Sequence, residues 1–73
     1  MLELRNSVIS IENIFSVSKG IVGYGNQPVV WLFQINVTYL VKKVFTTIVL
    51  EYGSDHDDRN KDFEKIKNLL LDK

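Results

Sequence analysis

Apolar and polar side chains alternate through the middle of the chain, over residues 29–52. Apolar residues take every second position in the first half of this stretch, and polar residues fall between them: Gln34, Asn36 and Thr38. This period of two is typical of a half-buried antiparallel strand. It predicts strands over 29–41 and 44–52, joined by a tight turn at Lys42-Lys43.

Pairing Val41 with Val44 across this turn sets the register of the predicted hairpin. The apolar positions of both strands then lie on one face, in these pairs: Tyr39–Thr46, Val37–Ile48, Ile35–Leu50 and Phe33–Tyr52. Trp31 continues that face. Burial of one face specifies the register, because a slip of one residue would expose every apolar side chain.

Residues 2–18 are rich in β-branched side chains, which predicts a further strand region there. Ile9 and Ile11 share one face in this pattern, and Phe15 and Val17 share another. The alternation slips near residues 13–14, which indicates either a bulge or two shorter strands joined there.

Residues 19–28 predict the main irregular connection, because they hold three of the four glycines and the only proline. Whether Ile21 to Tyr24 forms a strand or a flap stays open. The spacing of Gly20, Gly23 and Gly25 matches neither a P-loop nor a dinucleotide fingerprint, so a hairpin loop is favoured over a phosphate cradle.

The period changes after Gly53, where Phe63, Ile66 and Leu70 recur at helical spacing. This pattern predicts one amphipathic helix over 55–72, capped by Ser54 or Asp55. Asp62 and Lys65 are spaced to pair along its outer face.

The helix is the only predicted element that can cover the apolar sheet face. We therefore expect one α+β domain over 1–73, a curled antiparallel sheet of three to four strands (β-β-β-α) packed by one C-terminal helix.

Composition limits the function classes. The chain has 73 residues, no cysteine and a formal net charge of zero. Disulfides and thiolate metal sites are therefore excluded, and no overall field attracts nucleic acid or a membrane surface. No apolar run reaches about 18 residues, and the first residues do not resemble a secretion signal, so a cytoplasmic protein is expected.

Three segments carry a resemblance to a known architecture: V-I-S-I-E-N-I, the hairpin end I-V-L-E-Y, and D-D-R-N-K-D-F-E-K-I-K-N-L-L. Together they resemble small bacterial and phage proteins of pleckstrin-homology-like arrangement, in which a C-terminal helix closes a curled sheet. The chain is shorter than a complete domain of that kind. The resemblance implies a binding scaffold without catalytic residues, with strands missing or supplied by another copy.

One cluster has metal-ligand chemistry, and it comprises four consecutive residues: Asp55, His56, Asp57 and Asp58. Carboxylates at a helix start are favoured by the helix dipole, and adjacent residues diverge around the axis. We therefore favour a capped, acidic helix start over a metal site. No nucleophile motif accompanies the single histidine, so we expect no enzyme activity, no cofactor and no metal.

Aromatic side chains on a sheet face can stack nucleic-acid bases, and the candidates here are Trp31, Phe33 and Tyr39. Few basic residues flank them, so a core beneath the helix is favoured. A nucleotide or single-stranded nucleic acid remains the alternative ligand, with these candidate contacts: Lys19, Tyr24, Lys42 and Lys43.

The second sheet face has no predicted cover, and its candidate interaction residues are Leu32, Gln34, Leu40, Phe45, Thr47 and Val49. Apolar patches rimmed by polar groups usually mark protein contacts. We expect a non-enzymatic protein-binding module that forms a homo-oligomer, most simply a dimer. A small phage or mobile-element effector that inhibits a host protein by covering its surface fits this description.

Overall fold

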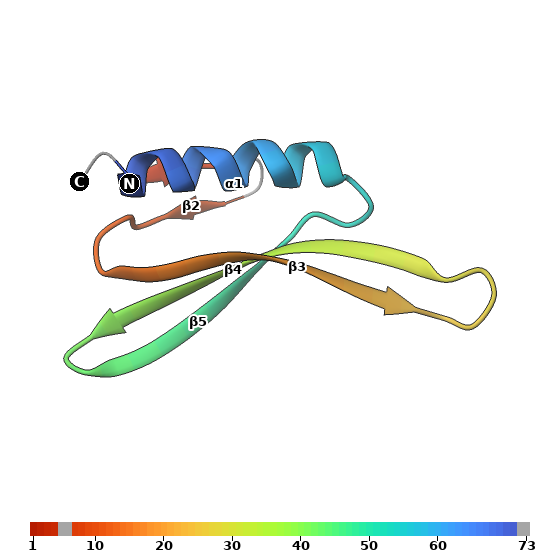
Figure 1. Ribbon diagram of the computed structural model, residues 1–73, viewed down its shortest axis with the longest axis horizontal. Coiled ribbons are helices and arrows are strands. Elements are labelled where there is room, and N and C mark those ends of the chain that lie inside the picture. The colour runs from red at the N-terminus through yellow and green to blue at the C-terminus, as the bar shows by residue number, and fades with distance from the viewer. Residues whose placement is uncertain (5–6, 72–73) are drawn as a thin grey trace.

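The computed structural model describes residues 1–4 and 7–71. The fold is α+β, as predicted, with two antiparallel sheets and one C-terminal helix (Figure 1). Its elements are β1 (Leu2–Glu3), β2 (Val8–Ile9), β3 (Ile14–Tyr24), β4 (Val30–Val41), β5 (Val44–Glu51) and α1 (His56–Leu71). The first two strands pair with each other, and the larger sheet has the order β3-β4-β5 and is not closed. Residue 72 of the predicted helix lies outside the described residues.

The predicted β4–β5 hairpin is confirmed in its register, from Val41 opposite Val44 to Ile35 opposite Leu50. Its turn consists of Lys42 and Lys43, with φ angles of 51° and 67°. Left-handed backbone at both positions is the geometry of a type I′ turn, whose twist matches that of the flanking strands.

The N-terminal part differs from the prediction of one strand region over 2–18. Two short strands, β1 and β2, precede a turn at Asn13, whose φ is 66°. The register then shifts between Ile14 and Ser16, and the extra residue is Phe15. This bulge places Phe15 and Val17 on opposite faces, so the prediction that they share a face is wrong.

Strand β3 continues to Tyr24, so the segment from Ile21 to Tyr24 is a strand. The predicted connection over 19–28 is thus shorter and comprises residues 25–29. Gly20 and Gly23 lie within β3, opposite Gln34 and Trp31 of β4. Extended strand backbone at these two glycines cannot form a phosphate cradle.

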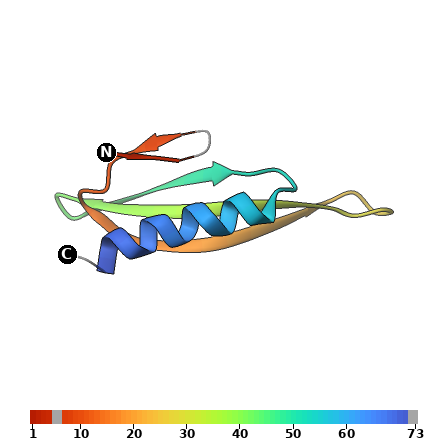
Figure 2. The same ribbon diagram turned by 90° about the horizontal axis from the view of Figure 1, so that it is seen from above.

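Both covering elements lie on one side of the larger sheet. Helix α1 crosses above β3 and β4, and the β1–β2 hairpin lies on the same side, next to β5 (Figure 2). Together they enclose a single core, made up of Leu4, Ile9, Ile35, Val37, Leu50, Tyr52 and Ile66. The predicted helix face is confirmed, because Phe63 and Leu70 pack against this core beside Ile66.

Two charged side chains of α1 are buried with the apolar ones. Asp62 accepts a hydrogen bond from the Tyr52 hydroxyl (2.7 Å), which ties the helix to the end of the sheet. The expectation that Asp62 lies on the outer face is therefore wrong. Arg59 Nη1 donates to the Gly20 carbonyl oxygen (3.1 Å), and its guanidinium lies 5.0 Å from the centroid of the Phe33 ring.

Within the described residues, no helix combines the length and apolar character needed to cross a membrane.

Ile66 tests the packing of the covered face, because its side chain is fully buried (0% exposed) between α1 and the sheet. We expect Ile66→Ala to lower the free energy of unfolding by about 2–5 kcal/mol, through lost burial and the cavity left behind. Urea unfolding followed by circular dichroism measures this change. Leu71→Ala is the matched control, since Leu71 is 74% exposed; an equal loss in both variants would contradict the packing described here.

The environment of Tyr39 predicts that the folded protein loses stability at alkaline pH. Its hydroxyl donates to the Ser10 carbonyl oxygen (2.7 Å), and partial burial raises the pKa of the Tyr39 phenol above its ordinary value of 10.0. The folded protein favours the neutral phenol, so this stabilisation is complete below about pH 10 and is lost as the pH rises through the folded-state pKa. We expect Tyr39→Phe to reduce the fall in unfolding free energy between about pH 9 and pH 11.5. An undiminished fall in Tyr39→Phe would refute the assignment.

Candidate protein-interaction surface

The sheet face opposite α1, here called the open face, has no element over it in the described part of the chain (Figure 1). Alternation along the paired strands assigns its residues. They are Phe15, Ser16, Ser18, Gly20, Val22 and Tyr24 from β3, Val30, Leu32, Gln34, Asn36, Thr38 and Leu40 from β4, and Phe45, Thr47, Val49 and Glu51 from β5.

All six predicted interaction residues lie on this face, and they are Leu32, Gln34, Leu40, Phe45, Thr47 and Val49. Phe45 is 59% exposed and Val49 is 48% exposed, whereas Leu32 and Leu40 are half-buried by their neighbours. The sequence analysis missed the contribution of β3. The alternation of Val22 and Tyr24 with the glycines was the signal that could have found it.

Most apolar residues of the open face gather at its two ends; Val49 is the exception, in the otherwise polar middle opposite Asn36. At the end near the β4–β5 turn, the rings of Phe15 and Phe45 pack edge to face, with centroids 4.9 Å apart, beside Leu40. The opposite end belongs to the β3–β4 hairpin and carries another apolar group: Val22, Tyr24, Val30 and Leu32. Exposed aromatic side chains of this kind supply contact area at low entropy cost.

The middle of the open face is polar. The hydroxyls of Thr38 and Thr47 are hydrogen-bonded across the strands (3.0 Å). A Cβ added at Gly20 would lie 2.9 Å from Asn36 Nδ2 and 3.4 Å from Gln34 Oε1. The two amide side chains therefore lean over Gly20, and they can both donate and accept hydrogen bonds.

Trp31 corrects the prediction that the whole aromatic row forms core beneath the helix. Phe33 and Tyr39 do pack against the core, but Trp31 is 53% exposed. The β3–β4 hairpin extends past the start of α1, so the helix does not reach this residue (Figure 1). Its ring instead lies over Gly23, where an added Cβ would be 2.9 Å from Trp31 Cζ3.

The alternative contacts for an anionic ligand are not brought together. Lys42 and Lys43 form the β4–β5 turn, whereas Tyr24 lies opposite Val30 at the far end of β4. Twelve residues of β4 separate these ends, which is roughly 35–40 Å of strand. Lys19 points to the covered face, where its Nζ lies 5.0 Å from the Phe63 ring centroid.

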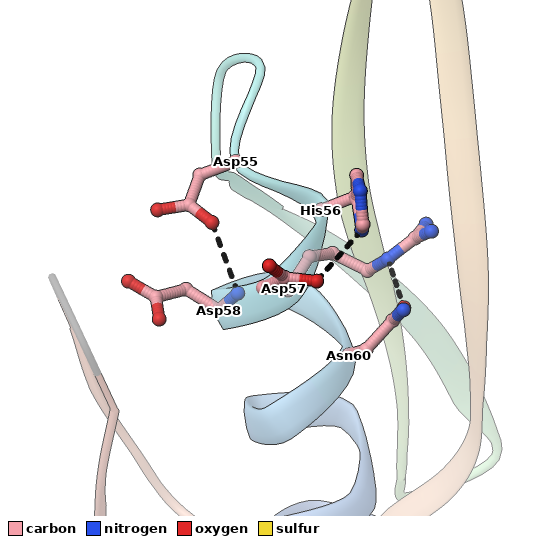
Figure 3. Close-up of polar contacts among 6 residues, drawn as sticks. Asp55, His56, Asp57, Asp58 and Asn60 are labelled. Carbon is pink, nitrogen blue, oxygen red and sulfur yellow. Dashed lines mark hydrogen bonds and ion pairs between the residues drawn. The ribbon is translucent and has the colours of Figure 1, made fainter.

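The acidic start of α1 is a capped helix terminus (Figure 3). Asp55 Oδ1 accepts the Asp58 backbone N–H (3.1 Å), so Asp55 is the cap, one of the two predicted residues. His56 Nδ1 lies 3.1 Å from Asp57 Oδ1, and the His56 ring packs against Phe33 with centroids 5.5 Å apart. No three His, Asp or Glu side chains among residues 1–4 and 7–71 are grouped to hold a metal ion.

A groove of about 530 Å³ runs between β1 and α1. Its lining consists of Glu3, Leu4, Asp58, Lys61, Asp62 and Lys65. These side chains carry both signs of charge but include no histidine, serine or threonine.

Comparison of the chain with protein-family models, with curated proteins and with solved structures gave no match. The pleckstrin-homology-like resemblance stays a prediction.

Substitution of Asp55 distinguishes its role as a helix cap from a role as a metal ligand. If it acts only as the cap, Asp55→Ala lowers the free energy of unfolding by about 1 kcal/mol, because the Asp58 N–H loses its acceptor. We expect the same loss in EDTA and in millimolar Ca²⁺, Mn²⁺ or Zn²⁺, measured by urea unfolding. A metal that stabilised the unmodified chain but not Asp55→Ala would show that the cluster is a binding site.

Proposed function

We propose that this chain is a protein-binding module that works by laying its open face against a protein surface. The observation that carries the proposal is the one-sided cover of the sheet. Every covering element of the described chain packs on the α1 side, which leaves Phe45, Val49 and the Phe15 ring exposed. Contiguous apolar surface with polar neighbours is the usual character of a protein contact.

The charge of the open face supports a protein rather than a nucleic acid as the partner. No charged residue occurs from Gly20 to Val41, and Glu51 is the one charged side chain among the residues assigned to this face. A nucleic-acid surface would carry Lys or Arg against the phosphates. The separation of Lys42 and Lys43 from Tyr24 removes the observation on which the nucleic-acid alternative depended.

Binding by surface contact requires no catalytic group, so the module is proposed to be non-enzymatic. The narrower function of a phage or mobile-element effector, which would inhibit a host protein by covering it, stays a prediction from small size and resemblance. Its cytoplasmic location also stays a prediction.

Site-specific crosslinking tests the proposal directly. A photoreactive benzoylphenylalanine in place of Phe45 should give one discrete protein adduct when cells of the native host are irradiated, because this ring lies within the proposed contact. The same residue in place of Leu71, an exposed apolar position of α1, is the matched control and should give none. Absence of an adduct at Phe45, or the same adducts at both positions, would refute the proposed contact surface.

A further inference from the structure

The chain exposes more surface than a compact protein of its size. Its accessible area is 5250 Å², whereas a compact monomer of 8.4 kDa exposes about 4,600 Å². Its radius of gyration is 13.3 Å, against about 11 Å for a compact chain of this length. The excess area, roughly 600 Å², approaches the 800 Å² or so that each partner contributes to a standard stable interface.

The open face is patterned so that it matches itself. Apolar groups occupy both ends, around Phe45 and around Tyr24. Between them, β3 and β4 carry a polar strip centred near Gln34 and Asn36, with Val49 of β5 beside it. A two-fold axis through this centre places apolar ends on apolar ends and amides on amides. This holds whether the axis runs along the strands or across them. Such self-complementarity is what an isologous dimer requires.

Charge also favours a copy of the same chain. When identical faces of two copies pack together, each charge lies close to a like charge of the other copy. Such like-charge contacts are costly in an interface. One charge is assigned to the face, Glu51, which is exposed on the edge strand β5 opposite Gln34. The cost is smallest for an axis along the strands, which places the two copies of Glu51 on opposite edges. At the centre, Asn36 and Gln34 each hold a donor and an acceptor, so that amide pairs can form reciprocally across an axis.

Pairing through the outer edge of β3 is the competing route to a dimer. Lys19 stands in the middle of that edge strand, and the bulge at Phe15 disrupts its start. An inward charge and a bulge are the devices that discourage edge pairing in natural sheets. Pairing through the β3 edge is therefore disfavoured relative to contact through the face.

We propose that the open face is covered by the open face of a second copy, in a two-fold symmetric dimer with the sheets stacked and Asn36 close to the axis. This inference rests on the proposed function, since it identifies the protein partner of the same surface. The dimer would stack two sheets with α1 on each outer side, as two layers do in a β-sandwich.

Charges placed at Asn36 test the arrangement. We expect the unmodified chain to sediment as a dimer, at about twice 8.4 kDa, in analytical ultracentrifugation at micromolar concentration. Asn36→Lys and Asn36→Asp should each raise the dimer dissociation constant roughly 100-fold, because like charges meet near the axis. An equimolar mixture of the two variants should recover the dimer, since opposite charges then meet.

The same substitutions on α1 provide the control. Asn68 is exposed on the helix, so Asn68→Lys and Asn68→Asp should dimerise as the unmodified chain does. Circular dichroism checks that the Asn36 variants stay folded. The inference is overturned if the unmodified chain stays monomeric up to about millimolar concentration. It is also overturned if the Asn36 variants dimerise almost as tightly as the unmodified chain, or if their mixture stays monomeric.

The crosslink at Phe45 separates failure of this inference from failure of the proposed function. An adduct of twice the chain mass supports the dimer. A monomeric chain whose Phe45 adduct contains a different protein overturns the dimer and leaves the binding function standing. A monomer without any adduct removes both.

Discussion

A three-stranded sheet has two faces, and residues 1–4 and 7–71 of this chain place all of their covering elements on one of them. Chain length limits how much of the sheet can be covered, because a chain of this length buries only about 60% of the surface that it exposes when unfolded. Helix α1 and the β1–β2 hairpin enclose Ile35, Val37 and Ile66 completely. The opposite face keeps its apolar ends exposed, and this exposure is the basis of the proposed protein contact.

The covered face is fixed by polar contacts as well as by burial. Arg59 reaches from α1 to the carbonyl oxygen of Gly20, and Asp62 accepts the Tyr52 hydroxyl near the end of β5. Both side chains are largely withdrawn from water, where an unpaired charge would be costly, so each favours one position of the helix along the sheet. Because the carbonyl bonded by Arg59 belongs to the residue beneath Gln34 and Asn36, the helix also steadies the centre of the open face.

Local sequence patterns correctly predicted the β4–β5 hairpin and helix α1. The β4–β5 register followed from alternation and from a two-residue turn, and the helix followed from the spacing of Phe63, Ile66 and Leu70. Those same strands supplied six residues of the candidate surface. The slip of the alternation near residues 13–14 indicated a bulge or a break, and the structure has a turn at Asn13 followed by a bulge at Phe15. The extension of β3 through Gly20 and Gly23 was not predicted, since glycines favour a loop assignment in a single sequence. The exposure of Trp31 depends on where helix α1 starts relative to the β3–β4 hairpin, which is a property of tertiary packing.

The turn at Lys42-Lys43 puts two bulky residues into left-handed backbone, where Asn-Gly would fold with less strain. Selection for folding alone would not favour lysines there. Together with Lys19, however, they bracket the uncharged run from Gly20 to Val41, in the position of the gatekeeper charges that flank aggregation-prone segments. Lysines at this tip would meet like charges if the tips of two copies approached, so the turn disfavours end-to-end contact between sheets.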